Sequence, residues 1–249
     1  RLGLSPDRSP VLLRFPLQTV ISHRIGYRAA IGLPGIRSGF FMDRRALLKS
    51  GLYALAGAAC PALQADSGKD YDAVVGQPGI GQRDIPAFPS IAAALAAAPD
   101  NAGLPFRIHV GVGRWHEKLL IDKPNIHLIG AHRNGSVLSF DAAAGMTGPD
   151  GKPWGTWGCA SVTVRAPDFR ASNLSIVNDF DYIGNLSAPK FEGIGPNGAQ
   201  AVALMLADGN DRCVIQNVDI IGHQDTLFVE SGRSLFRDCR ISGSVDFIF

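Results

Sequence analysis

Three segments of the sequence share one form, and their spacing limits the folds that the chain can adopt. Each has an apolar start, a polar bend and a final isoleucine: Phe169–Ile176, Cys213–Ile220 and Leu235–Ile241. The final isoleucines lie 44 and then 21 residues apart, which fits two turns and then one turn of a coil of about 21–22 residues. Short strands that repeat around a fixed polar bend are typical of a parallel β-helix, in which each turn stacks on the last. We therefore predict an all-β fold, a parallel β-helix, with Ile176, Ile220 and Ile241 inward in one column.

A β-sandwich with irregular strand spacing is the alternative fold. It would need tight Asn-Gly or Asp-Gly hairpins between paired strands. Four such dipeptides occur, beginning at Asn134, Asp150, Asn197 and Asp208. Three of them adjoin long loops, so the β-helix remains the favoured fold.

The expected elements after Ile80 are one helix and many short strands. The helix is predicted over Phe88–Ala98, because this stretch is rich in alanine and contains Ser90 as a possible N-cap. Apolar runs broken by Gly, Asn, Asp and Pro predict strands at Ile108–Val112, Ile126–Ile129, Val137–Phe140, Ser161–Val164, Ala201–Leu206 and Leu227–Val229.

Charge divides the chain unevenly. The composition, 46% apolar and 18% charged over 249 residues, is typical of a globular protein. Residues 1–41 hold six arginines against one aspartate, and residues 42–65 hold three basic residues against one aspartate, which leaves a net charge of −5 for residues 66–249. A folded part that is acidic is a poor partner for nucleic acid, and no nucleic acid is expected to bind.

The front of the chain reads as a targeting segment. Met42 precedes the pair Arg44-Arg45, and the apolar run Leu52–Ala59 that follows is too short to span a bilayer. We predict an export signal at residues 42–65, a catalytic domain at 66–249 and a periplasmic or secreted protein without a stable membrane span. Residues 1–41 precede the plausible start at Met42 and are interpreted as a disordered upstream extension.

The four cysteines give two open questions. Cys60 lies in the export signal, and an outer-membrane lipoprotein anchored there is a weak alternative, since Gly57 is a poor match to a lipobox. The other three, Cys159, Cys213 and Cys239, are an odd number, which fits either free thiols or a bridge to a cysteine outside this sequence.

Two aspartates follow the same repeat as the isoleucines. Asp225 and Asp246 are 21 residues apart, so they are expected at equivalent places on adjacent turns, about 4.7–4.9 Å apart. Two carboxylates this close do not both ionise readily, so one remains protonated near neutral pH. The pair can then supply a nucleophile and a proton donor, and the amides of Gln200 and Gln224 can stabilise an oxyanion. The alternative is that these aspartates only cap bends through hydrogen bonds to the backbone.

At these residues the chain resembles the bacterial branch of the pectinesterase (pectin methylesterase) family. The motifs that carry the resemblance are Gly113–Glu117, Asn178–Asp181, Gln200–Leu204, Gly222–Leu227 and Gly243–Phe249. The resemblance implies a right-handed parallel β-helix of the pectin lyase-like kind that removes methyl esters from galacturonan. It implies Asp246 as nucleophile, Asp225 as acid and then base, and Gln200 and Gln224 as oxyanion stabilisers. It also implies that Thr156, Val245 and Phe249 line the sugar groove.

The resemblance implies a monomer that acts on methyl-esterified homogalacturonan and uses no cofactor and no metal. A later Leu-Gly-Arg-Pro-Trp motif of the family is not in the sequence, so the β-helix is expected to be incomplete at its C-terminus and this chain by itself inactive. An inactive carbohydrate-binding β-helix, or an esterase or thioesterase for another ester, are the alternatives. A polysaccharide lyase is less favoured because the expected turns carry no cluster of carboxylates for Ca²⁺.

Overall fold

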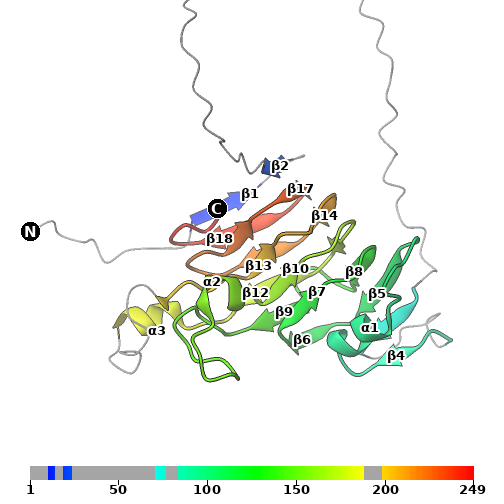
Figure 1. Cartoon of the computed structure of the whole chain (residues 1–249), viewed down its shortest axis with the longest axis horizontal. Helices are drawn as coiled ribbons and strands as arrows, with labels where there is room; N and C mark the ends of the chain where they lie inside the picture. The colour runs from blue at the N-terminus through cyan, green and yellow to red at the C-terminus, as the bar shows by residue number, and fades with distance from the viewer. Residues whose placement is uncertain (1–10, 15–18, 24–70, 77–83, 188–197) are drawn as a thin grey trace, which may run out of the picture. The chain divides into compact units, whose positions relative to one another are not determined.

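The structure is a computed structural model that describes residues 11–14, 19–23, 71–76, 84–187 and 198–249 (Figure 1). The predicted export signal at residues 42–65 lies outside these residues, as does Cys60. None of the helices within the described ranges is long and apolar enough to cross a membrane.

Three sheets make up the fold. The six-stranded sheet contains, in spatial order, β1 (Val11–Arg14), β18 (Arg240–Gly243), β15 (Asp219–Ile221), β12 (Ser175–Asn178), β9 (Ser136–Phe140) and β6 (Gly113–His116). The four-stranded sheet contains β16 (Leu227–Val229), β13 (Leu204–Leu206), β10 (Val162–Val164) and β7 (Leu119–Ile121). The eight-stranded sheet contains β2 (Thr19–His23), β17 (Gly232–Arg237), β14 (Cys213–Gln216), β11 (Arg170–Ser172), β8 (Ile126–Gly130), β5 (Phe106–Val110), β3 (Ala73–Val75) and β4 (Ala87–Phe88).

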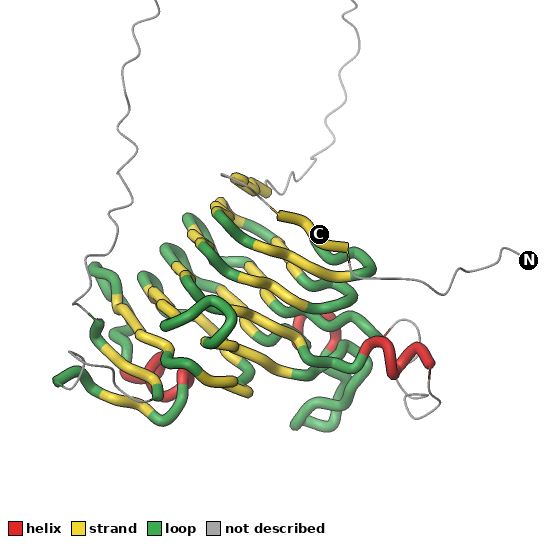
Figure 2. The backbone as a smooth tube through the Cα atoms, turned by 180° about the vertical axis from the view of Figure 1, so that it is seen from behind, coloured by secondary structure: helices red, strands yellow, loops and turns green. Residues whose placement is uncertain are grey.

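Successive strands of the chain enter different sheets, and every third strand returns to the same sheet. From β7 to β18 the chain visits the four-stranded, the eight-stranded and the six-stranded sheet in turn, and each returning strand pairs in parallel with its predecessor. Figure 2 shows the strands of successive turns lying side by side. This connectivity is that of a parallel β-helix, so the predicted fold class is confirmed and the sandwich is excluded.

The predicted isoleucine column lies in the six-stranded sheet. Ile176 pairs in register with Ile220, which pairs with Ile241, and each is 0% exposed. Replacing one buried isoleucine by alanine in such a core costs about 2–5 kcal/mol of folding free energy. The 21-residue step from Ile220 to Ile241 is one turn, as predicted, but the predicted two turns between Ile176 and Ile220 are wrong: β12 pairs directly with β15, so these 44 residues form a single turn, lengthened by the long connection between β12 and β13. The apolar column packs the turns against one another.

The polar bends of the repeat lie between the eight-stranded and the six-stranded sheet. Asn173, Asn217 and Asp238 all have left-handed backbone conformations, with φ of 55°, 52° and 55°. Asn and Asp adopt this conformation more readily than other non-glycine residues. The side-chain amide of Asn217 also donates to Oδ1 of Asn173, at 2.5 Å. The sharp turn at each bend thus follows from the residue type.

One helix packs against the first turns of the coil. Helix α1 (Ile91–Ala97) begins after Ser90, whose hydroxyl oxygen accepts the backbone N–H of Ala93 at 3.0 Å. It buries Ile91 and Leu95 and contacts β3, β4 and β7. The predicted helix and its cap are confirmed. The other helices among the residues that the structure describes are the short α2 (Gly155–Gly158) and α3 (Tyr182–Ser187).

All six predicted strand runs contain a strand, with ends shifted by up to three residues. Cys159, Cys213 and Cys239 are buried and form no disulfide with one another.

Two strands fall within residues 1–41, where the sequence predicted no regular structure. Strand β1 pairs antiparallel with β18, and β2 pairs antiparallel with β17. The N–H and C=O groups at the edge of a sheet bind an extended segment with little regard to its side chains, and side-chain periodicity therefore gave no sign of these strands. The interpretation of residues 1–41 as an upstream extension stays a prediction.

Candidate active site

Asp225 and Asp246 lie at equivalent places on adjacent turns, as their spacing predicted. Parallel bridges on either side of them join Gln224 to Val245 and Leu227 to Ile248, and each bridge spans the same 21-residue step. The backbone N–H of Asp225 donates to the carbonyl of Val245 at 3.0 Å. Both aspartates have left-handed φ values, 61° and 43°. Because strands in register lie about 4.7–4.9 Å apart, the two side chains leave the backbone as close neighbours.

The two carboxyl groups have unlike environments. Asp225 is only 7% exposed, whereas Asp246 is exposed to solvent. Burial, and after it the negative charge of Asp246, raises the pKa of Asp225 to about 6. Asp225 thus keeps its proton in mildly acidic solution beside a solvent-exposed carboxyl group. An exposed acid next to a buried, protonated one is the division of roles that acid and nucleophile require.

The two predicted glutamines adjoin the aspartate pair. The backbone N–H of Ala201 donates to the carbonyl of Gln224 at 3.1 Å, so the segment that begins at Gln200 lies one strand away from Gln224. The side-chain oxygen of Gln200 is buried without a hydrogen-bond partner, and the side chain of Gln224 makes no hydrogen bond to any other described residue. The unpaired buried atom of Gln200 is an acceptor oxygen and Gln224 is half-buried, so the role of their NH2 groups as donors to an oxyanion stays a prediction.

The three predicted groove residues differ in their surroundings. Val245 is half-buried and packs against a cluster that includes Ala201 and Tyr182. Thr156 lies on α2, and its carbonyl accepts the thiol of Cys159 at 3.4 Å. Phe249 is 42% exposed and takes part in a group of aromatic rings.

This aromatic group contains two residues that the sequence did not single out. Phe249 stacks on Phe228 with ring centroids 4.4 Å apart and planes at 14°. Phe228 meets Trp157 edge to face at 5.5 Å. Trp157 is 59% exposed, and its indole N–H donates to Oε1 of Glu230 at 3.3 Å. Phe228 precedes Phe249 by the same 21-residue step and could have been found from it, whereas Trp157 has no repeat signal.

His223 and Cys159 are the other reactive side chains close to the pair. The ring of His223 stacks on Tyr182 at 5.2 Å, Ser244 lies 3.3 Å from its Nδ1, and burial lowers its pKa. Cys159 is fully buried, and burial, together with the charge of Asp225, raises the pKa of its thiol. A buried, neutral thiol is a poor nucleophile, so the carboxylate pair remains the candidate reactive centre.

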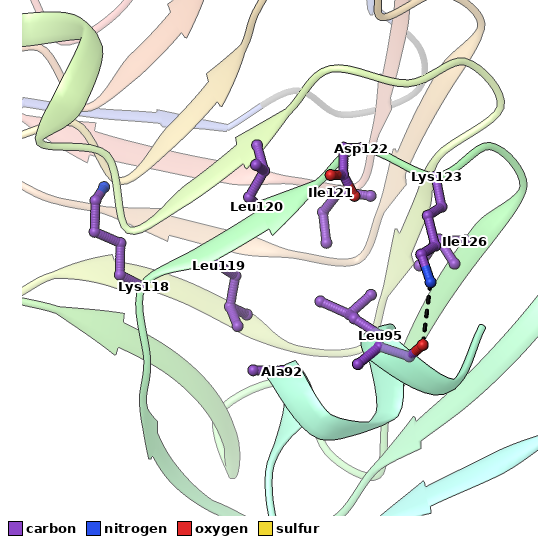
Figure 3. Close-up of a pocket in the computed structure, with 10 residues that line it drawn as sticks. Ala92, Leu95, Lys118, Leu119, Leu120, Ile121, Asp122, Lys123 and Ile126 are labelled. Carbon is purple, nitrogen blue, oxygen red and sulfur yellow. Dashed lines mark hydrogen bonds between the residues drawn. The ribbon is translucent and has the colours of Figure 1, made fainter. Parts of the chain in front are cut away.

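A cavity of about 210 Å³ lies elsewhere, between α1 and β7 (Figure 3). Its walls are mostly aliphatic, and Lys123 at its edge is already bound to the carbonyls of Ala96 and Ala98 and to Asp100. Strand β7 is three strands away from β16 in the four-stranded sheet. The aspartate pair remains the candidate for the chemistry, because the walls of the cavity contain one carboxylate, Asp122, and no second carboxylate beside it.

Comparison with known proteins points to one family. The family model described as Pectinesterase matches residues 72–249. Pectinesterase A of Dickeya dadantii is 42% identical over 186 residues, which are 75% of this chain and 50% of that protein. Probable pectinesterase/pectinesterase inhibitor 23 of Arabidopsis thaliana is 37% identical over 180 residues, 72% of this chain and 27% of that protein. The chain thus spans about half the length of the bacterial relatives that it matches.

Solved structures agree with this family. Pectin methylesterase PemA from Erwinia chrysanthemi is 40% identical with a TM-score of 0.63, over 69% of this chain and 49% of that one. A pectin methylesterase in complex with a hexasaccharide is 37% identical with a TM-score of 0.58, over 65% and 46% of the two chains. The fold is the right-handed parallel β-helix that the motifs led us to expect.

Proposed function

Because the chain belongs to the pectinesterase family, we propose that the protein removes methyl esters from galacturonan, giving methanol and free carboxylates. The observation that carries the proposal is the aligned pair of Asp225, buried with a pKa of about 6, and Asp246, exposed beside it. The family membership supports the ester as substrate, and the pair supports the chemistry.

In the proposed first step the carboxylate of Asp246 attacks the ester carbonyl carbon. The electron pair of the carbonyl moves to oxygen, and the amide groups of Gln200 and Gln224 donate hydrogen bonds to this oxyanion. When the oxyanion collapses, the bond to the methoxy group breaks and protonated Asp225 gives its proton to the departing methanol. An anhydride between Asp246 and the uronic acid remains.

In the proposed second step Asp225, now ionised, takes a proton from water. The hydroxide equivalent adds to the uronic acyl carbon of the anhydride, and the bond to the Asp246 oxygen breaks. The product is the free uronic acid, which then loses its proton to the solvent, while Asp246 returns as a carboxylate and Asp225 is protonated again. One water is consumed and one methanol is released in each cycle, without a metal or cofactor.

The aromatic group beside the pair supports a sugar chain as the occupant of the groove. Phe249, Phe228 and Trp157 form a continuous and partly exposed apolar surface. Such a surface suits the apolar faces of sugar rings and the methyl groups of the ester better than a highly charged ligand. A monomer is proposed, since one chain holds both aspartates.

Export belongs to the same proposal. The segment 42–65 supports it by its twin arginines and short apolar run. N-terminal sequencing of the exported protein should find residues 42–65 removed, and an intact Arg1 terminus would reject this interpretation. A lipid on Cys60 would appear as an added mass on the mature N-terminus.

The test is methanol release from methyl-esterified pectin by the full-length gene product that carries this chain. Asp246→Asn should abolish release, because an amide does not replace the carboxylate nucleophile. Gln224→Ala should lose one oxyanion donor, at about 2.7–4 kcal/mol of barrier, so a measurable rate should survive.

The ordering of the two variants decides the roles. Both are compared at equal folded fraction and with equal binding of pectin as the control. An Asp246→Asn variant more active than Gln224→Ala would remove Asp246 as nucleophile. Pectin binding with no turnover in the unmodified full-length protein would favour the carbohydrate-binding alternative, and release from another ester alone would favour a different esterase.

A further inference from the structure

Three side chains form a column on the outer face of the eight-stranded sheet. Arg107 on β5 pairs in register with His127 on β8, which pairs with Arg170 on β11. The next residue of each strand, namely Ile108, Leu128 and Ala171, is buried in the core. Because side chains alternate between the two faces of a strand, the column faces outward. Two strand steps separate the backbones of Arg107 and Arg170 by roughly 9.5 Å.

Neither guanidinium of the column has an acidic partner among the described residues. The carboxylate that acts on the column is Asp168, and Arg212 holds both of its oxygens, at 2.7 and 2.5 Å. Asp72, at the Arg107 end, accepts the backbone N–H of Arg107 with its Oδ2. The column therefore carries two cations that the described part of the protein leaves unpaired.

His127 separates the two cations and remains neutral. Burial, followed by the charges of Arg170 and Arg107, lowers its pKa to about 4, with Asp168 acting weakly in the opposite direction. At the pH where uronic acids are ionised, the column thus presents a guanidinium, a neutral imidazole and a second guanidinium. The imidazole can donate to or accept from a hydroxyl group, and the guanidiniums can bind carboxylates through two parallel hydrogen bonds.

This arrangement runs against the charge of the rest of the domain. Residues 66–249 carry a net charge of −5, yet two arginines stand unpaired on neighbouring strands of one face. We propose that the Arg107–His127–Arg170 column binds a stretch of galacturonan with free carboxylates. The choice of this polyanion rests on the proposed function, since it is the product of that reaction, and charge complementarity selects it over the uncharged ester.

A second site of this kind would keep the protein on partly demethylated pectin. The column lies on the eight-stranded sheet, whereas Asp225 and Asp246 adjoin the four-stranded sheet, so the two sites do not share residues. Binding at one site raises the effective concentration of the same polymer at the other. The expected consequence is attachment to the product regions of the polymer while the ester regions enter the groove.

The experiment measures binding to polygalacturonate and to fully methyl-esterified pectin by affinity electrophoresis. The full-length protein carries Asp246→Asn, so that the ester polymer is not consumed. Adding Arg107→Ala and Arg170→Ala should weaken polygalacturonate binding at least tenfold and reduce its salt dependence, with ester binding unchanged. Arg165→Ala is the matched control, because Arg165 is also exposed and has no ion pair among the described residues. Arg107→Lys with Arg170→Lys should recover part of the affinity, since lysine keeps the charge but not the bidentate geometry.

Three outcomes would overturn the proposal: unchanged polygalacturonate binding in the double alanine variant, an equal loss in Arg165→Ala, or an equal loss for the esterified polymer. Thermal unfolding of each variant shows whether it is folded. Methanol release by the protein without Asp246→Asn is measured separately. If the full-length protein releases no methanol but the double variant still loses polygalacturonate binding, the binding site is supported and the proposed esterase activity is rejected. If release is normal and binding is unaffected, only the column is rejected.

Discussion

The aspartate pair and the Arg107–His127–Arg170 column are built by the same stacking on two different sheets. In the pair, parallel register places the two aspartates on adjacent turns, and in the column it places each arginine one strand away from His127, at a spacing of about 4.7–4.9 Å in both cases. In the pair, the second charge helps to raise the pKa of Asp225 to about 6. In the column, two charges help to lower the pKa of His127 to about 4. The same spacing therefore produces opposite changes in proton affinity.

The two sites differ in which of their groups gain or lose a proton near neutral pH. Asp225 is buried and its neighbour Asp246 is exposed, so a proton can move on and off one member near neutral pH. In the column the arginines keep their charge at any ordinary pH, and His127 takes the whole response by losing its proton. The pair is therefore suited to chemistry that moves protons, and the column to holding a fixed positive charge.

Asp225→Asn should have the largest effect among the tests of this comparison. The variant loses both leaving-group protonation and water activation, so methanol release should fall about 10²–10⁴-fold. In the unmodified full-length protein, kcat/KM should decline on the alkaline side with an apparent pKa near 6, because Asp225 must be protonated to act as the acid. The measurement is a pH profile of methanol release.

The control for this profile is the double variant Arg107→Ala and Arg170→Ala. It removes the charges of the column but leaves the surroundings of Asp225 intact, so the alkaline limb should stay in place. A limb that moves with the column, or an Asp225→Asn variant with normal activity, would contradict the separation of the two sites.

The ionised side chain of Asp225 should also lower the free energy of unfolding, and this effect is smaller than the effect of Asp225→Asn on activity. The folded-state pKa of Asp225, about 6, lies above its ordinary value of 3.8, so the folded state binds the proton more tightly than the unfolded state. Its contribution is fully present below about pH 4 and is lost as the pH rises through about 6. Asp225→Asn should therefore be more stable than the unmodified protein at pH 7.5, by roughly 1–3 kcal/mol, with little difference at pH 4.

Urea unfolding at the two pH values measures this difference. Asp238→Asn is the matched control, because Asp238 also occupies a left-handed bend but is not buried beside a second aspartate. It should show no comparable gain. A gain in Asp225→Asn that is equal at both pH values would mean that the buried charge is not its cause.

The fold and the aspartate pair were accessible from the sequence for one physical reason. Where a turn has no long connection, equivalent positions recur after 21 residues, so Ile220 and Ile241, or Asp225 and Asp246, report their neighbours by spacing alone. The turn from Ile176 to Ile220 takes 44 residues, so its spacing was misinterpreted as two turns. The bends at Asn173 and Asn217 follow in the same way from residues that tolerate left-handed φ.

The features that the sequence did not predict do not recur at a constant spacing along the chain. Strands β1 and β2 add to sheet edges through backbone hydrogen bonds, which need no apolar pattern. Trp157 lies on α2 in the loop between β9 and β10, and its contact with Phe228 depends on how that loop folds back. The column was hidden because its two turns differ in length: one turn takes 20 residues from Arg107 to His127 and the next takes 43 from His127 to Arg170, so no constant step marks these positions.

Trp157→Ala should give the smallest effect and separates the groove from the column most directly. Trp157 is exposed and meets Phe228 edge to face, so its loss removes part of the aromatic surface without opening the core. An aromatic contact of this kind is worth about 0.5–1.5 kcal/mol, which corresponds to a rise of roughly 2- to 12-fold in KM for methyl-esterified pectin. The value of kcat should stay within about twofold, because Trp157 contacts Phe228 and Glu230 and takes no part in moving protons. Leu104→Ala, which also truncates an exposed apolar side chain, is the control and should leave KM unchanged.

In the Asp246→Asn background, Trp157→Ala should leave binding of polygalacturonate to the Arg107–His127–Arg170 column intact. A lower kcat at constant KM would mean that Trp157 positions the reacting ester. A loss of polygalacturonate binding as well would mean that the aromatic surface and the column bind the polymer as one extended site.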